Sequence, residues 1–255
     1  MCSLSFAGVR SGKATADWPT ASATYEAGRP VQTALRLVID EGFHTYWSNP
    51  GEGGMKISIA WELPAGWTAG ALEHPVPERF ATGGLANLGY KGTVVFPVKL
   101  SPPAHAAGAV KLRALVSWLS CDDHSCIPGE AALELALEPG PPTATPEAKE
   151  IETALARVPR PASDGLTLNV TEQPDTLRLT ITATAAEWNA AAHEIFPATP
   201  EIIDPMAEFV FVREGAIWTA EVAKSEYLAT PVAELVLVLV HRDGTPPVSL
   251  TWTPQ

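Results

Sequence analysis

Two cysteines five positions apart, Cys121 and Cys126, lie in the segment Trp-Leu-Ser-Cys-Asp-Asp-His-Ser-Cys-Ile-Pro-Gly. The chain on either side, over residues 112–119 and 130–137, has the Val- and Leu-rich pattern of β-strands. We therefore expect the cysteines to flank the tip of a hairpin, where facing residues bring their Cβ atoms to about 4.5–5.5 Å, close to what a disulfide needs. Such a disulfide can open and close without rebuilding the fold, as a redox site requires.

Three chemistries are open to this pair. A structural disulfide around so short a loop would stabilise the fold by only about 2 kcal/mol, and a chain of 255 residues can bury a full core without it. Metal ligation is the second alternative, because Cys121, His124 and Cys126 are soft ligands that select Cu(I). Only three methionines occur in the chain, however, and no second His/Cys cluster lies nearby in sequence. Redox chemistry is the interpretation that we favour.

The residues between the cysteines bear on how readily a thiolate forms. Asp122 and Asp123 disfavour a thiolate by like-charge repulsion, whereas protonated His124 would favour it. Because two carboxylates oppose one histidine that is only partly protonated, we predict that the thiol pKa values are not strongly lowered from about 8.5. The other interpretation of the two aspartates is ordinary turn chemistry, since Asp side chains bond to their own backbone in turns.

Composition indicates a globular protein, with 46% hydrophobic and 18% charged residues. The net charge of −12 comes mainly from residues 141–255, which hold 7 basic and 16 acidic side chains, and such a surface repels nucleic-acid phosphates. No apolar run is long enough to span a membrane, and the first residues lack the layout of a secretion signal. A cysteine pair poised to oxidise nevertheless favours an oxidising compartment. No phosphate-binding loop, Ser/His/Asp set or paired catalytic carboxylates stands out, so we expect no cofactor.

The chain divides near Pro139, where a Pro-rich stretch predicts a linker. A short helix should follow, with Thr145 as N-cap, Pro146 at its first position and Pro159 beyond its end. The expected domains are residues 1–138 and 161–255, joined by the linker and helix of residues 139–160. Both domains should be all-β sandwiches, because strand patterns recur over residues 31–40, 56–63, 92–100, 166–182, 208–222, 234–242 and 248–252.

Five segments in order then carry a resemblance over roughly residues 20–138. They are His-Thr-Tyr-Trp-Ser-Asn-Pro-Gly from residue 44, Trp-Glu-Leu-Pro-Ala-Gly-Trp from 61, His-Pro-Val-Pro-Glu-Arg-Phe from 74, Asn-Leu-Gly-Tyr-Lys-Gly-Thr-Val-Val-Phe-Pro-Val from 87, and the cysteine segment. The domain resembles the amino-terminal domain of DsbD-type thiol:disulfide interchange proteins, in particular the ScsB-like branch associated with copper tolerance. Two later segments, Glu194-Ile-Phe-Pro and Ile202-Ile-Asp-Pro, resemble the second extracytoplasmic module of ScsB-like proteins.

The resemblance implies two tandem immunoglobulin-like β-sandwich domains in the periplasm, belonging to the extracytoplasmic region of a bacterial inner-membrane protein. It implies a thiol:disulfide oxidoreductase that takes electrons from a thioredoxin-like domain of the same full-length protein and reduces a thioredoxin-fold partner of the ScsC or DsbC kind. By the match, Cys126 forms mixed disulfides with partners and Cys121 resolves them. The cysteine spacing here is one residue shorter than the classical DsbD spacing.

The resemblance also implies a cap over the cysteines, with Leu88 and Tyr90 as the covering side chains. The alternative is an edge hairpin whose Tyr90 packs on its own sheet. His44 and Tyr46 align with a segment beside the site, where Tyr46 could donate a hydrogen bond to a thiolate or could simply be core. Two further functions stay open for the whole chain, namely a non-catalytic protein-binding module with a structural disulfide and a Cu(I)-binding protein.

Overall fold

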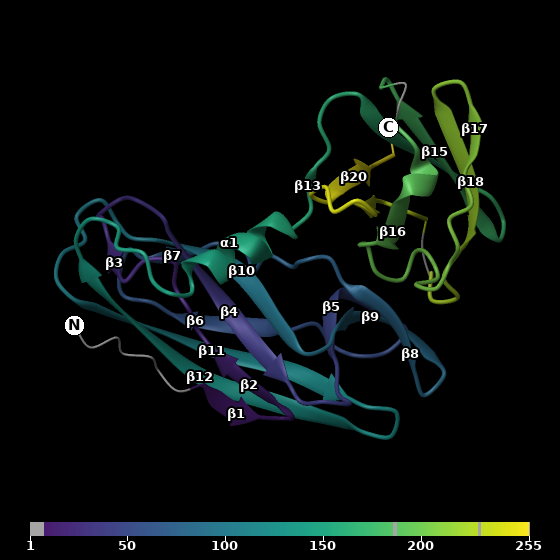
Figure 1. The fold of residues 1–255 in the computed structure, drawn as a ribbon. Helices are drawn as coiled ribbons and strands as arrows, with labels where there is room; N and C mark the ends of the chain where they lie inside the picture. Colours follow the sequence, from purple (N-terminus) through teal and green to yellow (C-terminus); the bar gives the residue numbers. More distant parts are fainter. Residues whose placement is uncertain (1–7, 186–187, 229–230, 255) are drawn as a thin grey trace. The chain divides into compact units, whose positions relative to one another are not determined.

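The computed structural model describes residues 8–185, 188–228 and 231–254. Over these residues the chain is mostly β-strand, with one α-helix and one short 3-10 helix (Figure 1). It forms two compact units. Unit 1 comprises residues 1–47, 54–75 and 89–156, and unit 2 comprises residues 48–53, 76–88 and 157–255. No helix among the described residues combines the length and apolar character that a membrane crossing needs.

Unit 1 contains a five-stranded sheet in the order β1-β2-β4-β10-β7 and a four-stranded sheet in the order β3-β12-β11-β6. Its strands are β1 (Val9–Ser11), β2 (Ala14–Asp17), β3 (Thr24–Tyr25), β4 (Val31–Ile39), β6 (Ser58–Glu62), β7 (Thr68–Ala69), β10 (Thr93–Ser101), β11 (Val110–Cys121) and β12 (Cys126–Pro139). Leu35 and Leu37 of β4 are buried with Val31 and Ile39, whereas Val38 faces outward. The strand predicted over residues 31–40 is confirmed.

The hairpin of β11 and β12 is the longest pairing of unit 1 and runs without a break from Val110 opposite Leu137 to Cys121 opposite Cys126. Leu133, Leu135 and Leu137 are buried on one face of β12. The predicted hairpin with the cysteines at its tip is therefore confirmed.

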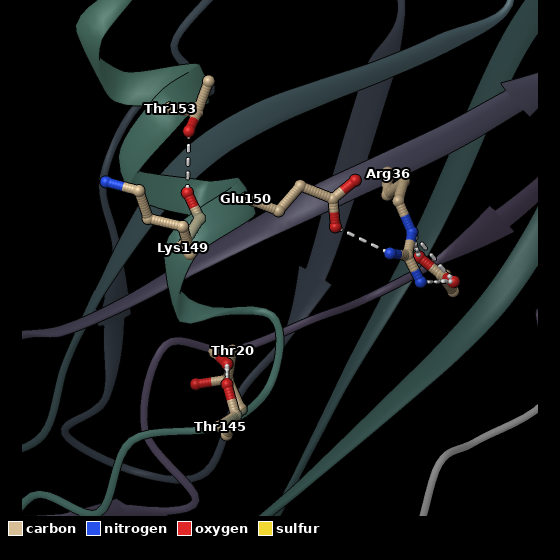
Figure 2. Close-up of polar contacts among 7 residues, drawn as sticks. Thr20, Arg36, Thr145, Lys149, Glu150 and Thr153 are labelled. Atoms are coloured by element: carbon tan, nitrogen blue, oxygen red, sulfur yellow. Dashed lines mark hydrogen bonds and ion pairs between the residues drawn. The ribbon is translucent and has the colours of Figure 1, made fainter.

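The predicted helix is also present, as α1 (Ala148–Ala156), and it packs on the five-stranded sheet. Its buried side chains Ile151 and Ala154 form an apolar cluster with Ala34 of β4 and Val95 of β10. Polar contacts fasten the same helix (Figure 2). The Arg36 guanidinium lies between Asp17 and Glu150, whose carboxylates are 2.7 Å from Nη2 and Nη1 respectively.

The Pro-rich segment before the helix lies alongside residues 20–25 and is hydrogen-bonded to them. The Gly140 N–H donates to the Tyr25 carbonyl at 2.9 Å, and the Ala23 N–H donates to the Thr143 carbonyl at 2.9 Å. The Thr145 hydroxyl, expected to cap the helix, donates to the Thr20 carbonyl (Figure 2). These hydrogen bonds hold the Pro-rich segment against residues 20–25 within unit 1.

Unit 2 contains two four-stranded sheets, in the orders β13-β20-β19-β16 and β14-β15-β18-β17. The strands are β13 (Arg160–Pro161), β14 (Leu166–Glu172), β15 (Thr176–Ala183), β16 (His193–Pro197), β17 (Val212–Glu214), β18 (Ile217–Ala223), β19 (Leu235–His241) and β20 (Val248–Trp252). Leu177, Leu179 and Ile181 of β15 share its core with Leu235 and Leu237 of β19.

A third sheet, in the order β5-β9-β8, belongs partly to each unit. Its strands are β5 (Thr45–Gly51), β8 (Glu78–Thr82) and β9 (Leu85–Tyr90). The division between the units falls after Trp47 in β5 and after Leu88 in β9. Residues 48–53 and 76–88, which the sequence placed in the first domain, thus group with residues 157–255, and the predicted domain boundaries stay a prediction.

Candidate functional site

Cys121 and Cys126 form a disulfide, with an S–S distance of 2.02 Å and Cα atoms 4.1 Å apart. They are the last residue pair of the β11–β12 hairpin, so the antiparallel register itself brings them together. Cys121 is 0% exposed, whereas Cys126 is an exposed residue. Attack on a disulfide needs access to the sulfur that is attacked, and Cys126 is therefore the member of the pair that an external thiolate can reach.

The turn between the cysteines is held by Asp122. Its Oδ1 accepts hydrogen bonds from the backbone N–H groups of His124 at 2.8 Å and Ser125 at 2.7 Å, and from the Ser125 hydroxyl at 3.1 Å. These bonds, led by the one from His124, hold the pKa of the Asp122 carboxyl below its usual range, so the group is ionised at neutral pH. Asp122 thus has the turn-forming geometry of the second interpretation, and Asp123 and His124 are exposed beside it.

The neck of the hairpin rests on a tryptophan. Trp118 is fully buried and stands opposite Gly129 on the neighbouring strand. A Cβ atom on Gly129 would lie 2.4 Å from the indole Cε2 of Trp118, so only glycine allows the ring to cross the strand there. The β1–β2 turn also approaches Gly129 closely, since a Cβ on Gly12 would lie 2.3 Å from the Gly129 Cα. The neck is therefore fixed by its packing against Trp118 and against the β1–β2 turn.

His44 lies directly beside the buried cysteine. Its backbone N–H donates to the Cys121 carbonyl at 3.0 Å, and the Cys121 N–H donates to the His44 carbonyl at 3.0 Å. The His44 Nε2 is 3.3 Å from the Tyr46 hydroxyl, and the two rings meet edge to face.

Burial leaves both side chains of this His44–Tyr46 pair uncharged at neutral pH. It lowers the pKa of His44 to about 4, and the positive charge of Lys91 lowers that pKa further, whereas Asp123 and Asp122 act in the opposite direction. Burial also raises the pKa of Tyr46. The pair consequently brings no positive charge to Cys121.

Leu88 and Tyr90, the expected cap residues, are both buried. The Tyr90 hydroxyl donates to the Pro75 carbonyl at 2.7 Å, and its ring meets the Phe96 ring edge to face with centroids 5.2 Å apart. Tyr90 therefore packs within unit 1 in this oxidised form, and Leu88 falls within the part of β9 that belongs to unit 2. A covering role for either side chain stays a proposal.

Two histidines that look scattered in the sequence come together in unit 2. His193 and His241 are directly opposite on β16 and β19, with ring centroids 4.7 Å apart. Only the register of two strands far apart in sequence reveals this pair. Within the described parts of the chain, no group of three or more His, Cys, Asp or Glu side chains has the geometry to hold a metal ion. Cys2 lies outside the described residues.

Comparison with known proteins now places the site in a family. The family model described as "Thiol:disulfide interchange protein DsbD, N-terminal" matches residues 14–138, which include both cysteines. Residues 14–138 are a DsbD amino-terminal domain. No curated protein sequence matches the chain.

Two solved structures were matched to the chain, and one of them resembles it over both units. One is the N-terminal periplasmic domain of ScsB from Proteus mirabilis, with a TM-score of 0.67, 22% identity, and coverage of 95% of this chain and 92% of that one. The other is Spo0M, a sporulation control protein from Bacillus subtilis, with 11% identity and coverage of 95% and 91%. Its TM-score of 0.23 is too low to bear on the fold. The likeness to ScsB extends the shared fold to both units.

Proposed function

We propose that this chain is the periplasmic, ScsB-like region of a thiol:disulfide interchange protein, built from two tandem immunoglobulin-like domains, and that it relays electron pairs through Cys121 and Cys126. The observation that carries the proposal is the disulfide at the tip of the β11–β12 hairpin, with one exposed and one buried cysteine, within a DsbD amino-terminal domain. A relay needs one sulfur that a partner protein can attack. It also needs a second sulfur, protected from partners, that resolves the mixed disulfide.

In the oxidised form, a thiolate of the donor dithiol attacks Sγ of Cys126. The Cys121–Cys126 bond breaks, a mixed disulfide forms between donor and Cys126, and Cys121 leaves as a thiolate that takes up a proton. The second donor thiolate then attacks the donor sulfur of the mixed disulfide and releases Cys126. The donor leaves oxidised to a disulfide, and the cysteine pair has gained two electrons.

In the reduced form, the Cys126 thiolate attacks a disulfide of the substrate protein and displaces one substrate thiolate. The Cys121 thiolate then attacks Sγ of Cys126, which re-forms the bond seen here and releases the second substrate thiolate. The donor is a thioredoxin-like domain of the same full-length protein, and the substrate is a thioredoxin-fold protein of the ScsC or DsbC kind. A location in the periplasm fits this proposal, because disulfides form and persist in oxidising compartments.

The reduction potential of the Cys121–Cys126 pair tests the proposal. The Cys2→Ser variant is equilibrated with dithiol buffers, and its free thiols are counted. A value between about −180 and −270 mV, the range of exchange proteins, supports a relay. A value below roughly −300 mV marks a structural disulfide and favours the non-catalytic binding module. The matched control is the same protein with Cys126→Ser, which must show no titrating pair.

A further inference from the structure

Four of the sequence segments described above meet at one place in unit 2. Asn49 comes from the first segment and Arg79 from the segment that begins at His74. Their hydrogen-bond partners lie in residues 194–197 and 202–205, the two segments of the second half of the chain. We call residues 48–53 and 76–88 the arm, and residues 194–197 with Pro205 the anchor. Both belong to unit 2.

Arg79 of β8 makes the densest set of these contacts. Its Nε donates to the Pro205 carbonyl at 3.1 Å, Nη1 to the Glu194 carboxylate at 3.2 Å, and Nη2 to the Ile195 carbonyl. The guanidinium also lies over the Phe196 ring, 4.5 Å from its centroid. This combination of divergent donors and a flat cation on a ring is specific to arginine, and a lysine cannot reproduce it.

The other segment of the arm is held independently. Asn49 is buried, its Nδ2 donates to the Pro197 carbonyl at 2.8 Å, and its Oδ1 accepts from the Gly51 N–H at 3.1 Å. Both polar atoms of the amide are therefore engaged. The Val76 N–H, at the start of the second arm segment, donates to the Arg157 carbonyl at 3.0 Å. The arm is thus fixed at both of its segments by residues that follow it by 70 positions or more.

The strands of the arm continue into unit 1 beside the disulfide. β5 runs back from Asn49 to Thr45, which follows the residue paired with Cys121. β9 runs forward from the arm to Tyr90. β5 and β9 are hydrogen-bonded neighbours in one sheet, so the arm and the residue after His44 share one ladder of backbone hydrogen bonds. Loosening the arm in unit 2 should therefore loosen the backbone that flanks Cys121.

We propose that the second half of the chain anchors the arm, and that Arg79 is a positioning residue that restrains the arm and so sets how fast a thioredoxin-fold protein exchanges with Cys126. The first part of the proposal concerns order in the arm and stands alone, whereas the part on exchange rate rests on the proposed function. It assigns a role to residues 157–255, which hold neither of the paired cysteines.

The experiment uses the full chain with Arg79→Ala, Arg79→Lys and Asn49→Ala. Arg178→Ala is the matched control, because Arg178 forms an exposed ion pair with Glu221 in the same unit. Amide hydrogen exchange is followed by mass spectrometry in peptides that cover residues 45–51 and 85–90. Loss of hydrogen bonds to a charged group should lower protection of both strands by about tenfold or more in Arg79→Ala. Arg79→Lys should be intermediate and the control unchanged.

The same proteins are then reduced by a reduced bacterial thioredoxin and, separately, by dithiothreitol, and their reduction potentials are measured. We expect the Arg79→Ala rate with thioredoxin to differ from the parent by about threefold or more, with the potential unchanged because the cysteines and their turn are intact. A general loss of stability would instead also lower protection in peptides that cover β4 and α1 of unit 1.

Unchanged protection of the arm in Arg79→Ala and Asn49→Ala would overturn the anchor. Lower amide protection of the arm with an unchanged rate of reduction by thioredoxin would overturn the proposal that the arm sets the rate of exchange at Cys126. If the parent itself does not exchange with thioredoxin, the proposed function fails, and the protection data still decide the anchor. Should Arg79→Ala not fold, Arg79→Lys and Asn49→Ala carry the same comparison.

Discussion

Replacing one cysteine at a time tests whether the two sulfurs differ in access as their burial indicates. In the Cys2→Ser background, Cys121→Ser leaves the exposed Cys126 as the one remaining cysteine, and Cys126→Ser leaves the buried Cys121. We expect Cys126 to react far faster with a thiol reagent than Cys121 does.

The size of the difference follows from what must open to expose Cys121. Its two backbone hydrogen bonds with His44 contribute about 1 kcal/mol each. Exposing the side chain, which is fully buried, costs about 1 kcal/mol more. An opening free energy of about 3 kcal/mol slows the reaction by roughly 100-fold.

The assay is stopped-flow reaction with an aromatic disulfide reagent over a pH series, so that each rate is corrected for the thiolate fraction of its own thiol. In urea-unfolded protein the two cysteines should react at similar rates, which controls for local sequence. Corrected rates within about threefold of each other in the folded protein would refute the assignment of Cys126 as the partner-facing sulfur and the opening energy derived from the His44 pairing.

Burial lowers the pKa of His44 and of His74 to about 4, so the unfolded chain binds more protons than the folded one between about pH 6.5 and 4. The free energy of unfolding should therefore fall as pH falls through that window, by at most about 3 kcal/mol per histidine. A free energy of unfolding in urea that does not change between pH 6.5 and about 4 would contradict this. Asp122→Ala removes both the charge and the acceptor that organises the turn, whereas Asp122→Asn removes the charge and keeps Oδ1, so Asp122→Ala should make the cysteine pair easier to reduce than Asp122→Asn does. Equal reduction potentials for these two variants, measured against a dithiol buffer, would show that the hydrogen bonds of the turn do not affect the reduction of the pair. Ile151→Ala should cost about 2–5 kcal/mol in urea unfolding because Ile151 is fully buried. Lys149→Ala, on the exposed face of α1, should stay within about 0.5 kcal/mol, and a similar loss in both would contradict the docking of the helix.

Local patterns in the sequence were sufficient for the elements that carry the cysteines. β11 and β12 alternate with a period of two, and the cysteines end both strands, so their pairing needs no information from elsewhere. The same holds for β4 and for α1, whose start the proline and acidic residues after Thr145 mark.

Contacts between distant segments were beyond such patterns. Nothing local to His44 indicates that its backbone pairs with Cys121, and nothing local to Arg79 indicates Glu194, which lies 115 positions later. The contacts of the Pro-rich segment were likewise beyond local patterns. Its composition excludes regular structure, yet its carbonyls still accept hydrogen bonds from residues 20–25, as the Pro141 carbonyl does from the Thr24 hydroxyl.

The electrostatics of the site bear on the direction of electron flow. A disulfide becomes a strong oxidant when its reduced form is stabilised, which requires positive charge or hydrogen-bond donors at the thiolate. Here Asp122 stays ionised in the turn, and burial keeps His44 neutral beside Cys121. Both effects withhold stabilisation from a Cys121 thiolate, so the reduced pair gains little from ionisation. We therefore expect its potential to lie nearer −270 mV, as in thioredoxin, than −120 mV, as in DsbA. A pair with that potential donates electrons to more oxidising thioredoxin-fold partners, which is the direction that the proposed relay requires.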